Sequence, residues 1–196
     1  TMLRNSKDVK INKLLVGVEP IKKSTLNKYY ELNSNIKIVN GYGPTETTIC
    51  STALEYEKDE KNDDIVSIGR PIHNTNIYIV DKNINIVPVG VPGELCISGN
   101  GVGCGYINNQ AETDKHFVNN IFDNSSSLYK TGDLAKWNTD GTISYIARKD
   151  SQVKISGYRI ELQEIDYTIM QYPSITKCLT IVYNTGKKSY LITYFT

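Results

Sequence analysis

Two short apolar runs, separated by a segment of helical character, constrain the fold of this chain more than any other feature. Residues 13–18 (KLLVGV) and 36–42 (IKIVNGY) have the length and apolar content of buried strands. Between them, Ser24 is positioned to cap a short helix that continues to about Leu32. A strand, a helix and a strand in this order predict a parallel βαβ unit.

After a polar loop at residues 55–64, the pattern changes to short apolar runs separated by turns, which predicts an antiparallel sheet or small barrel. The expected strands are residues 65–69, 76–81, 83–88, 93–99, 127–133 and 141–147. A helix at residues 111–118 interrupts this series, and residues 119–127 are expected to form a loop.

From about Asp150 the pattern of apolar and polar residues changes again. Residues 152–161 have strand character, and Leu162, Ile165 and Ile169 then share one face of a predicted helix. Residues 177–184 and 189–195 predict a hairpin. The fold class is therefore a mixture of α/β and α+β, in three parts: residues 1–60, 61–149 and 150–196.

Composition excludes several function classes. The net charge of +1 argues against nucleic acid or an anionic membrane as partner. The sequence shows neither a long apolar run nor a signal-peptide pattern, so we expect a cytoplasmic protein with no membrane association. The four cysteines are scattered, which favours reduced thiols over a disulfide framework or a zinc site.

Familiar phosphate and nucleophile motifs are absent from the sequence. The glycine-rich run SGNGVGCGY (residues 98–106) does not fit G-x-G-x-x-G, because the third glycine would fall on Cys104 or Tyr106. Tight turns explain these glycines better. Neither His73 nor His116 lies beside a nucleophile motif, which argues against a Ser-His-Asp hydrolase.

Three stretches carry residue types suited to binding a nucleotide. In NGYGPTETT (residues 40–48), an aromatic ring, hydroxyls and a carboxylate follow an expected strand, where α/β sheets bind ligands. In YKTGDL (residues 129–134), an aspartate suits the two hydroxyls of a ribose. Basic residues gather in ARKDSQVKISGYRIELQEID (residues 147–166). Taken singly, a helix-capping threonine, a turn aspartate and a solvated strand remain alternative explanations.

Together, these stretches resemble core motifs of the amino-acid-adenylating domains of nonribosomal peptide synthetases, within the superfamily of acyl- and aryl-CoA ligases and luciferases. The resemblance covers nearly the whole chain and rests on four segments: NGYGPTETTIC, VGVPGELCISGNGVGCGY, YKTGDLAKWNTDGTISYIARKD and QVKISGYRIELQEID. It implies an adenylate-forming fold, with the end of a large α/β subdomain, a small antiparallel β-barrel and the start of a C-terminal α+β lobe.

The resemblance also implies an activity and its cofactors. An amino-acid carboxylate would react with ATP and Mg²⁺ to form an aminoacyl adenylate, which then passes to the phosphopantetheine thiol of a peptidyl carrier protein. An acyl- or aryl-CoA ligase and a non-catalytic nucleotide-binding or docking remnant are the alternatives. The expected phosphate loop and late catalytic lysine are not found in the sequence, so we expect a partial domain that is poorly active alone and self-associates.

The same resemblance implies a role for individual residues. Asn40 and Tyr42 would contact adenine, Asp133 would bind the ribose, and Tyr145 and Arg148 would lie near the ribose and phosphates. Thr45 would contact the α-phosphate, Glu46 would bind Mg²⁺, Asp150 would be the hinge, and Lys154 would lie on a catalytic loop. The amino-acid pocket would be lined by Leu15, Gly17, Gly41, Ile49 and Cys50, which favours a hydrophobic substrate. Ala147, Ser156 and Cys104 depart from the residues usual in the family.

Overall fold

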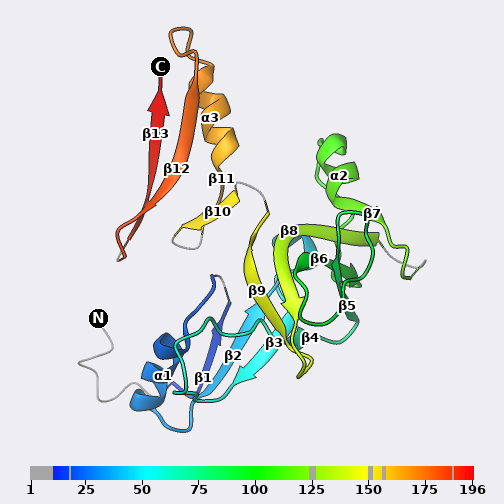
Figure 1. Cartoon of the computed structure of the whole chain (residues 1–196), viewed down its shortest axis with the longest axis vertical. Helices are drawn as coiled ribbons and strands as arrows, with labels where there is room; N and C mark the ends of the chain where they lie inside the picture. The colour runs from blue at the N-terminus through cyan, green and yellow to red at the C-terminus, as the bar shows by residue number, and fades with distance from the viewer. Residues whose placement is uncertain (1–10, 18, 124–126, 150–151, 156–157, 187) are drawn as a thin grey trace. The chain divides into compact units, whose positions relative to one another are not determined.

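The computed structural model describes residues 11–17, 19–123, 127–149, 152–155, 158–186 and 188–196 (Figure 1). The chain divides into two compact units, Thr1–Ala147 and Arg148–Thr196. The three-part division expected from the sequence, with boundaries after residues 60 and 149, stays a prediction. Among the described residues, no helix is long and apolar enough to cross a membrane.

The first unit begins with a four-stranded sheet in the order β1-β2-β3-β4. Its strands are β1 (Lys13–Val16), β2 (Lys37–Tyr42), β3 (Thr52–Tyr56) and β4 (Arg70–Pro71). Helix α1 (Lys23–Leu32) connects β1 to β2, which pair in parallel, while the other two pairings are antiparallel. The predicted βαβ unit is therefore confirmed. Leu26 of α1 is fully buried against Ile38 of β2 and its neighbours.

Two details of this region differ from the sequence-based expectation. Ser24 lies inside α1 and not at its cap; the carboxylate of Asp63 accepts the Ser24 backbone N–H at 3.1 Å instead. Strand β3 extends through Tyr56, so the polar loop begins after that residue. The loop returns to the start of α1 and supplies the cap that Ser24 was expected to provide. Strand β3 continues because Glu55 and Tyr56 pair with β2.

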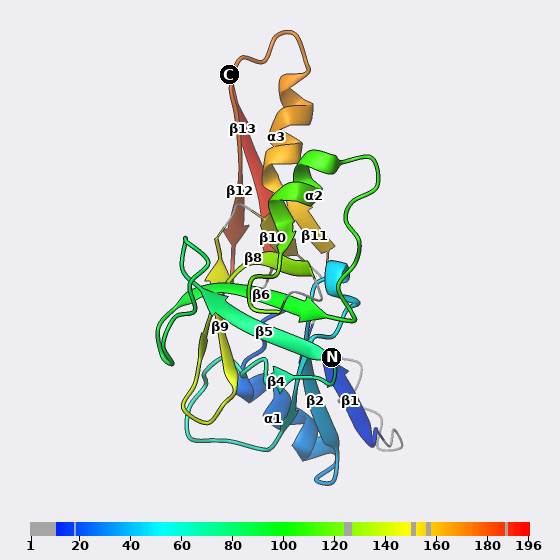
Figure 2. The same cartoon turned by 90° about the vertical axis from the view of Figure 1, so that its right-hand side faces the viewer.

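A second, five-stranded antiparallel sheet follows, in the order β5-β6-β8-β7 with β9 also paired to β8. Its strands are β5 (Thr75–Val80), β6 (Gly93–Gly99), β7 (Phe117–Asn119), β8 (Ser127–Trp137) and β9 (Ile143–Arg148). Strands β5 and β6 lie side by side in Figure 2. The antiparallel sheet is confirmed, and its closure into a barrel stays a prediction. Residues 65–69 and 83–88 are not strands and make isolated bridges.

Helix α2 (Gln110–His116) occupies most of the expected helix at residues 111–118. It ends early because Phe117 and Val118 begin β7 and pair with Tyr129 and Leu128 of β8.

The two sheets of the first unit share a core. Tyr42, at the end of β2, packs in one buried cluster with Ile79 of β5, Leu95 of β6 and Ile143 of β9. The backbone reinforces this contact, because the Ile68 N–H donates to the Ile143 carbonyl at 2.9 Å. The end of β2 is thereby fixed against the second sheet.

The second unit contains two antiparallel hairpins and one helix. Its elements are β10 (Gln152–Ile155), β11 (Tyr158–Glu161), α3 (Leu162–Met170), β12 (Cys178–Asn184) and β13 (Ser189–Phe195). Helix α3 lies beside β12 (Figures 1 and 2), where the Thr180 hydroxyl donates to the Asp166 carboxylate at 2.6 Å. The expected helix and C-terminal hairpin are confirmed.

Gly17, just beyond β1, lies directly against the backbone of Gly41 in β2. Gly17 has a φ of +141°, and a Cβ added there would lie 1.6 Å from the Gly41 carbonyl oxygen. A side chain at Gly17 would therefore force the two strands apart.

We predict that Gly17→Ala lowers the free energy of unfolding by at least about 2 kcal/mol, since it adds a steric clash to a backbone conformation that L residues rarely adopt. Gly90→Ala is the matched control, because Gly90 has a φ of +86° but no atom within 4 Å of an added Cβ. Urea unfolding of both variants measures the difference. Equal losses would contradict the clash at Gly17.

Candidate functional site

The loop after β2 turns sharply and holds two strained residues. Thr45–Thr47 form one turn of 3-10 helix, after which Thr48 and Ile49 adopt left-handed φ values of 61° and 71°. β-branched residues adopt this conformation at a cost of roughly 1–3 kcal/mol each. The Ser51 N–H donates to the Tyr42 carbonyl at 2.7 Å and closes the loop onto β3. The alternative that a threonine caps a helix here does not hold, because Pro44 occupies the N-cap position and no side chain caps the turn.

A buried hydrogen bond joins this loop region to the second sheet. The Tyr42 hydroxyl donates to the Asp133 carboxylate at 2.5 Å, although the two residues are 91 positions apart. Both residues are nearly buried, with 8% and 6% of their surfaces exposed. Two of the residues predicted to bind a nucleotide are therefore neighbours.

A bulge in β8 presents Asp133 to the loop. Residues 131–133 face the single residue Leu95 of β6, and Gly132 adopts a φ of +73°. The Asp133 N–H donates to the Thr131 hydroxyl at 3.0 Å, which fixes the bulge. Asp133 thus lies within a strand, in agreement with the strand expected at residues 127–133, and the alternative of a turn aspartate does not hold. Bulges commonly re-aim side chains beside functional sites.

Glu46 has a partner that the sequence did not identify. The Tyr106 hydroxyl donates to Glu46 Oε1 at 2.7 Å and lies 3.3 Å from the Tyr129 hydroxyl. Burial, reinforced by these hydrogen bonds to Tyr129 and Glu46, raises the pKa of Tyr106 far above its usual value. Tyr106 therefore stays protonated and acts as a donor. In the sequence, the one feature that could have pointed to Tyr106 is its position at the end of the glycine-rich run.

The glycine-rich run packs against the loop that contains Glu46. The Gly103 N–H donates to the Glu46 carbonyl at 2.8 Å, and the Thr48 hydroxyl donates to the Gly101 carbonyl at 2.7 Å. A Cβ at Gly101 would lie 3.0 Å from the Thr47 carbonyl oxygen. These glycines permit close backbone packing, in agreement with the turn interpretation of the sequence.

Four of the five predicted substrate-pocket residues lie close together at the ends of β1 and β2: Leu15, Gly17, Gly41 and Cys50. A Cβ added at Gly41 would lie 3.2 Å from the Cys50 sulfur and 3.7 Å from Leu15 Cδ1, and Gly17 lies against the Gly41 backbone. The side chains of Leu15 and Ile49 are exposed. The atoms that surround Gly41 are apolar, and their role as a substrate pocket stays a prediction.

The remaining predicted site residues are less closely associated. Asn40 is buried, and its amide donates to the Ser67 carbonyl at 2.8 Å. Thr45 is exposed, whereas Tyr145 is half-buried and packs against the core of the second sheet. In the second unit, Arg148 is half-buried and the backbone of Lys154 lies in β10. Asp150 and Ser156 lie outside the described residues.

The donors in the loop after β2 are compatible with the magnesium ion that the resemblance implies. Across the described ranges, no group of three His, Cys, Asp or Glu side chains is arranged to hold an ion. Mg²⁺ needs fewer protein ligands, since it typically binds one or two carboxylates together with phosphates of the substrate. Half-buried Glu46, next to the exposed hydroxyl of Thr45, fits that requirement.

Comparison with known proteins agrees with this geometry. The family of AMP-binding enzymes matches residues 2–107, more than half of the chain. Tyrocidine synthase 1 of Brevibacillus parabrevis is 47% identical over 146 residues, which are 74% of this chain and 13% of that protein. Gramicidin S synthase 2 of Brevibacillus brevis is 41% identical over 181 residues, which are 91% of this chain and 4% of that protein.

A solved structure shares the fold over most of the chain. The match is PA1221, an NRPS protein containing adenylation and PCP domains, with a TM-score of 0.82 and 28% identity. It covers 94% of this chain and 38% of the PA1221 chain, so the residues described here span a minor part of the proteins they match. This chain therefore belongs to the family of AMP-binding enzymes and corresponds to part of an adenylation domain of the nonribosomal peptide synthetase type.

Proposed function

We propose that this chain contributes the nucleotide-binding part of a site that activates an amino acid with ATP. A carboxylate oxygen attacks the α-phosphorus, an oxygen–phosphorus bond forms, and pyrophosphate leaves with the electron pair of the broken bond. A carrier-protein thiolate then attacks the acyl carbon, and AMP leaves. The observation that carries the proposal is the hydrogen bond between Tyr42 and Asp133 at the end of β2, with Glu46 in the turn that follows this strand.

Asp133 is proposed to bind the ribose. A carboxylate accepts hydrogen bonds from two vicinal hydroxyls, and such charge-assisted bonds contribute about 1.5–3 kcal/mol each. In the structure, the Tyr42 hydroxyl donates a hydrogen bond to one oxygen of the Asp133 carboxylate. The ribose hydroxyls of a bound nucleotide therefore replace the Tyr42 hydroxyl at this carboxylate or share the carboxylate with it. The Tyr42 ring then lies beside the adenine.

Thr45 and Glu46 are proposed to act at the phosphates. The exposed Thr45 hydroxyl donates to an α-phosphate oxygen, and Glu46 supplies an oxygen ligand for Mg²⁺. Mg²⁺, when bound, neutralises charge on the phosphate oxygens. Donors fixed in place before the reaction stabilise charge that develops in the transition state.

The other roles rest on the resemblance alone. We propose Asn40 at the adenine edge, Tyr145 and Arg148 near ribose and phosphates, Asp150 as hinge and Lys154 on a loop of the second unit. The partner is a peptidyl carrier protein, since PA1221 contains both adenylation and PCP domains. Self-association and a cytoplasmic location stay predictions.

The substrate is proposed to be a hydrophobic amino acid. Gly41 places no side chain at the end of β2, and Leu15 and Cys50 border it with apolar atoms, while Gly17 packs against its backbone. A pocket of this composition favours an apolar side chain over a charged one because it offers no compensating partner for a buried charge.

We predict that the complete protein catalyses amino-acid-dependent exchange between ATP and pyrophosphate, and that Asp133→Asn raises the dissociation constant for ATP at least about tenfold, the equivalent of one lost charge-assisted bond. The amide keeps the carboxylate's shape and still accepts from Tyr42. Asp81→Asn is the control, since Asp81 accepts backbone N–H groups in a distant turn. Exchange rates and calorimetric titration provide the measurements.

Other outcomes separate the alternatives. ATP binding without exchange for any amino acid would indicate a non-catalytic nucleotide-binding remnant. AMP release that requires coenzyme A and a carboxylic acid without an amino group would indicate an acyl- or aryl-CoA ligase. ATP affinity unchanged by Asp133→Asn would contradict the proposed ribose contact.

We predict that Gly41→Ala shifts selectivity roughly tenfold from larger toward smaller amino acids, because one methyl group in an apolar pocket changes discrimination by that order. The added methyl would lie 3.2 Å from the Cys50 sulfur. The ratio of kcat/KM for an aromatic and a small aliphatic amino acid measures the shift, with Gly90→Ala as control. A uniform loss for both substrates would argue against the pocket assignment.

A further inference from the structure

The hydroxyl of Tyr106 lies in a directed chain of hydrogen bonds. An ionised carboxylate is an acceptor, so the Tyr106 proton belongs to the 2.7 Å bond with Glu46. The 3.3 Å contact between the two tyrosine hydroxyls must then run from Tyr129 to Tyr106. Tyr129 is fully buried in β8. The direction of donation is therefore fixed from the core of the second sheet outward to Glu46.

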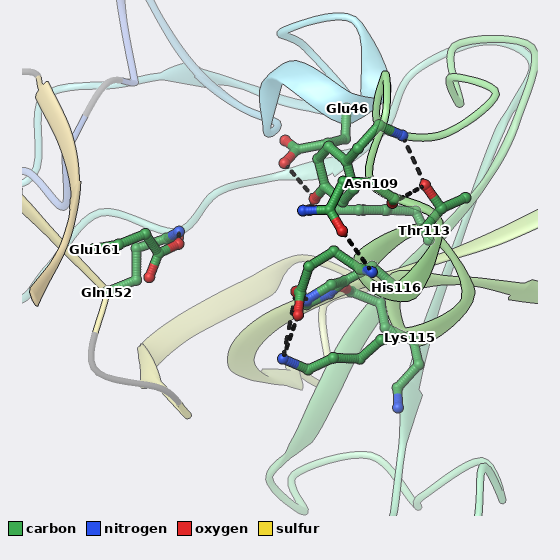
Figure 3. Close-up of polar contacts among 11 residues, drawn as sticks. Glu46, Asn109, Thr113, Lys115, His116, Gln152 and Glu161 are labelled. Atoms are coloured by element: carbon green, nitrogen blue, oxygen red, sulfur yellow. Dashed lines mark hydrogen bonds and ion pairs between the residues drawn. The ribbon is translucent and has the colours of Figure 1, made fainter. Parts of the chain in front are cut away.

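The backbone of Tyr106 is fixed independently by α2. Its N–H donates to the Thr113 hydroxyl at 2.9 Å, and that hydroxyl donates to the Asn109 carbonyl at 2.9 Å. Gly105 permits this contact, because it has a φ of +129° and an added Cβ would lie 2.5 Å from Thr113 Cγ2. Figure 3 marks the hydrogen bonds of Glu46, Asn109 and Thr113 with dashed lines.

Aromatic neighbours restrict the ring of Tyr106. Phe117 meets it edge to face with centroids 5.4 Å apart, and His116 does so at 6.3 Å. Phe117 also packs on Tyr129 at 4.9 Å. The ring thus has few orientations open to it, and its hydroxyl points at a single carboxylate oxygen.

The same segment holds Glu46 at two points. Gly103 donates its N–H to the Glu46 carbonyl, while Tyr106 donates to the Glu46 side chain. Backbone and carboxylate are therefore positioned together by residues 103–106. An arrangement of this kind limits both the location and the rotation of the carboxylate.

We propose that Tyr106 is a positioning residue that orients the Glu46 carboxylate toward Mg²⁺. This inference rests on the proposed function and adds a residue with no assigned role. Partners that orient metal-binding carboxylates commonly change metal affinity by 10- to 100-fold when removed. Tyr106 acts through Glu46 and need not touch the nucleotide.

The test is Tyr106→Phe in the complete protein, with Mn²⁺ as a paramagnetic probe of the metal site in the presence of ATP. We expect the Mn²⁺ dissociation constant, measured by electron paramagnetic resonance, to rise about tenfold. The Mg²⁺ concentration for half-maximal exchange should rise similarly, while the KM for the amino acid stays within about twofold. A general structural defect would change both quantities.

Tyr78→Phe is the matched control, because Tyr78 stacks on Phe122 in the same unit and should leave Mn²⁺ binding unchanged. Glu46→Gln should abolish the nucleotide-dependent Mn²⁺ signal. If Glu46→Gln does so but Tyr106→Phe stays within twofold of wild type, the positioning role is overturned and the proposed function stands. If wild type shows no nucleotide-dependent Mn²⁺ binding, both are overturned.

Discussion

The hydrogen bond from Tyr42 to Asp133 links the two sheets of the first unit at a point where each departs from regular structure. Tyr42 ends β2, and Asp133 occupies a bulge in β8. A carboxylate this deeply buried requires donors, since an unpaired buried charge costs several kcal/mol. The shared core around Tyr42 supplies the rigid support. The carboxylate proposed to bind the ribose therefore lies beside the ring proposed to contact adenine because of how these sheets pack.

The conformation of the loop that follows Tyr42 depends on contacts with the glycine-rich segment and with β3. Thr48 and Ile49 keep left-handed conformations because the glycine-rich segment and the return to β3 hold their neighbours in place. That segment also positions Glu46 through Tyr106. Groups proposed for adenine, ribose and metal are thus fixed before any ligand arrives, as electrostatic catalysis requires.

Sequence patterns predicted the elements whose partners lie nearby in the chain, such as the βαβ unit and the last hairpin. They failed where long-range packing decided the outcome. Apolar and polar residues alternate at positions 65–69 as in a strand, although this segment does not pair in a sheet. The alternation arises because Val66 and Ile68 pack in two different apolar clusters. Ser24 lost its capping role to Asp63, 39 residues away. Motifs predicted that Glu46 and Asp133 belong to one nucleotide site, which stays a prediction, whereas Tyr106 was identified only by its hydrogen bond to Glu46 in the structure.

The central claim is that the end of β2 forms a nucleotide cradle with Asp133, and a crystal structure of the protein with AMP tests it most directly. The account predicts ribose hydroxyls within hydrogen-bond distance of the Asp133 carboxylate and the adenine beside the Tyr42 ring. It also predicts that the 2.5 Å bond between these residues is replaced or shared. AMP bound elsewhere, with this bond unchanged and no ribose contact to Asp133, would contradict the account.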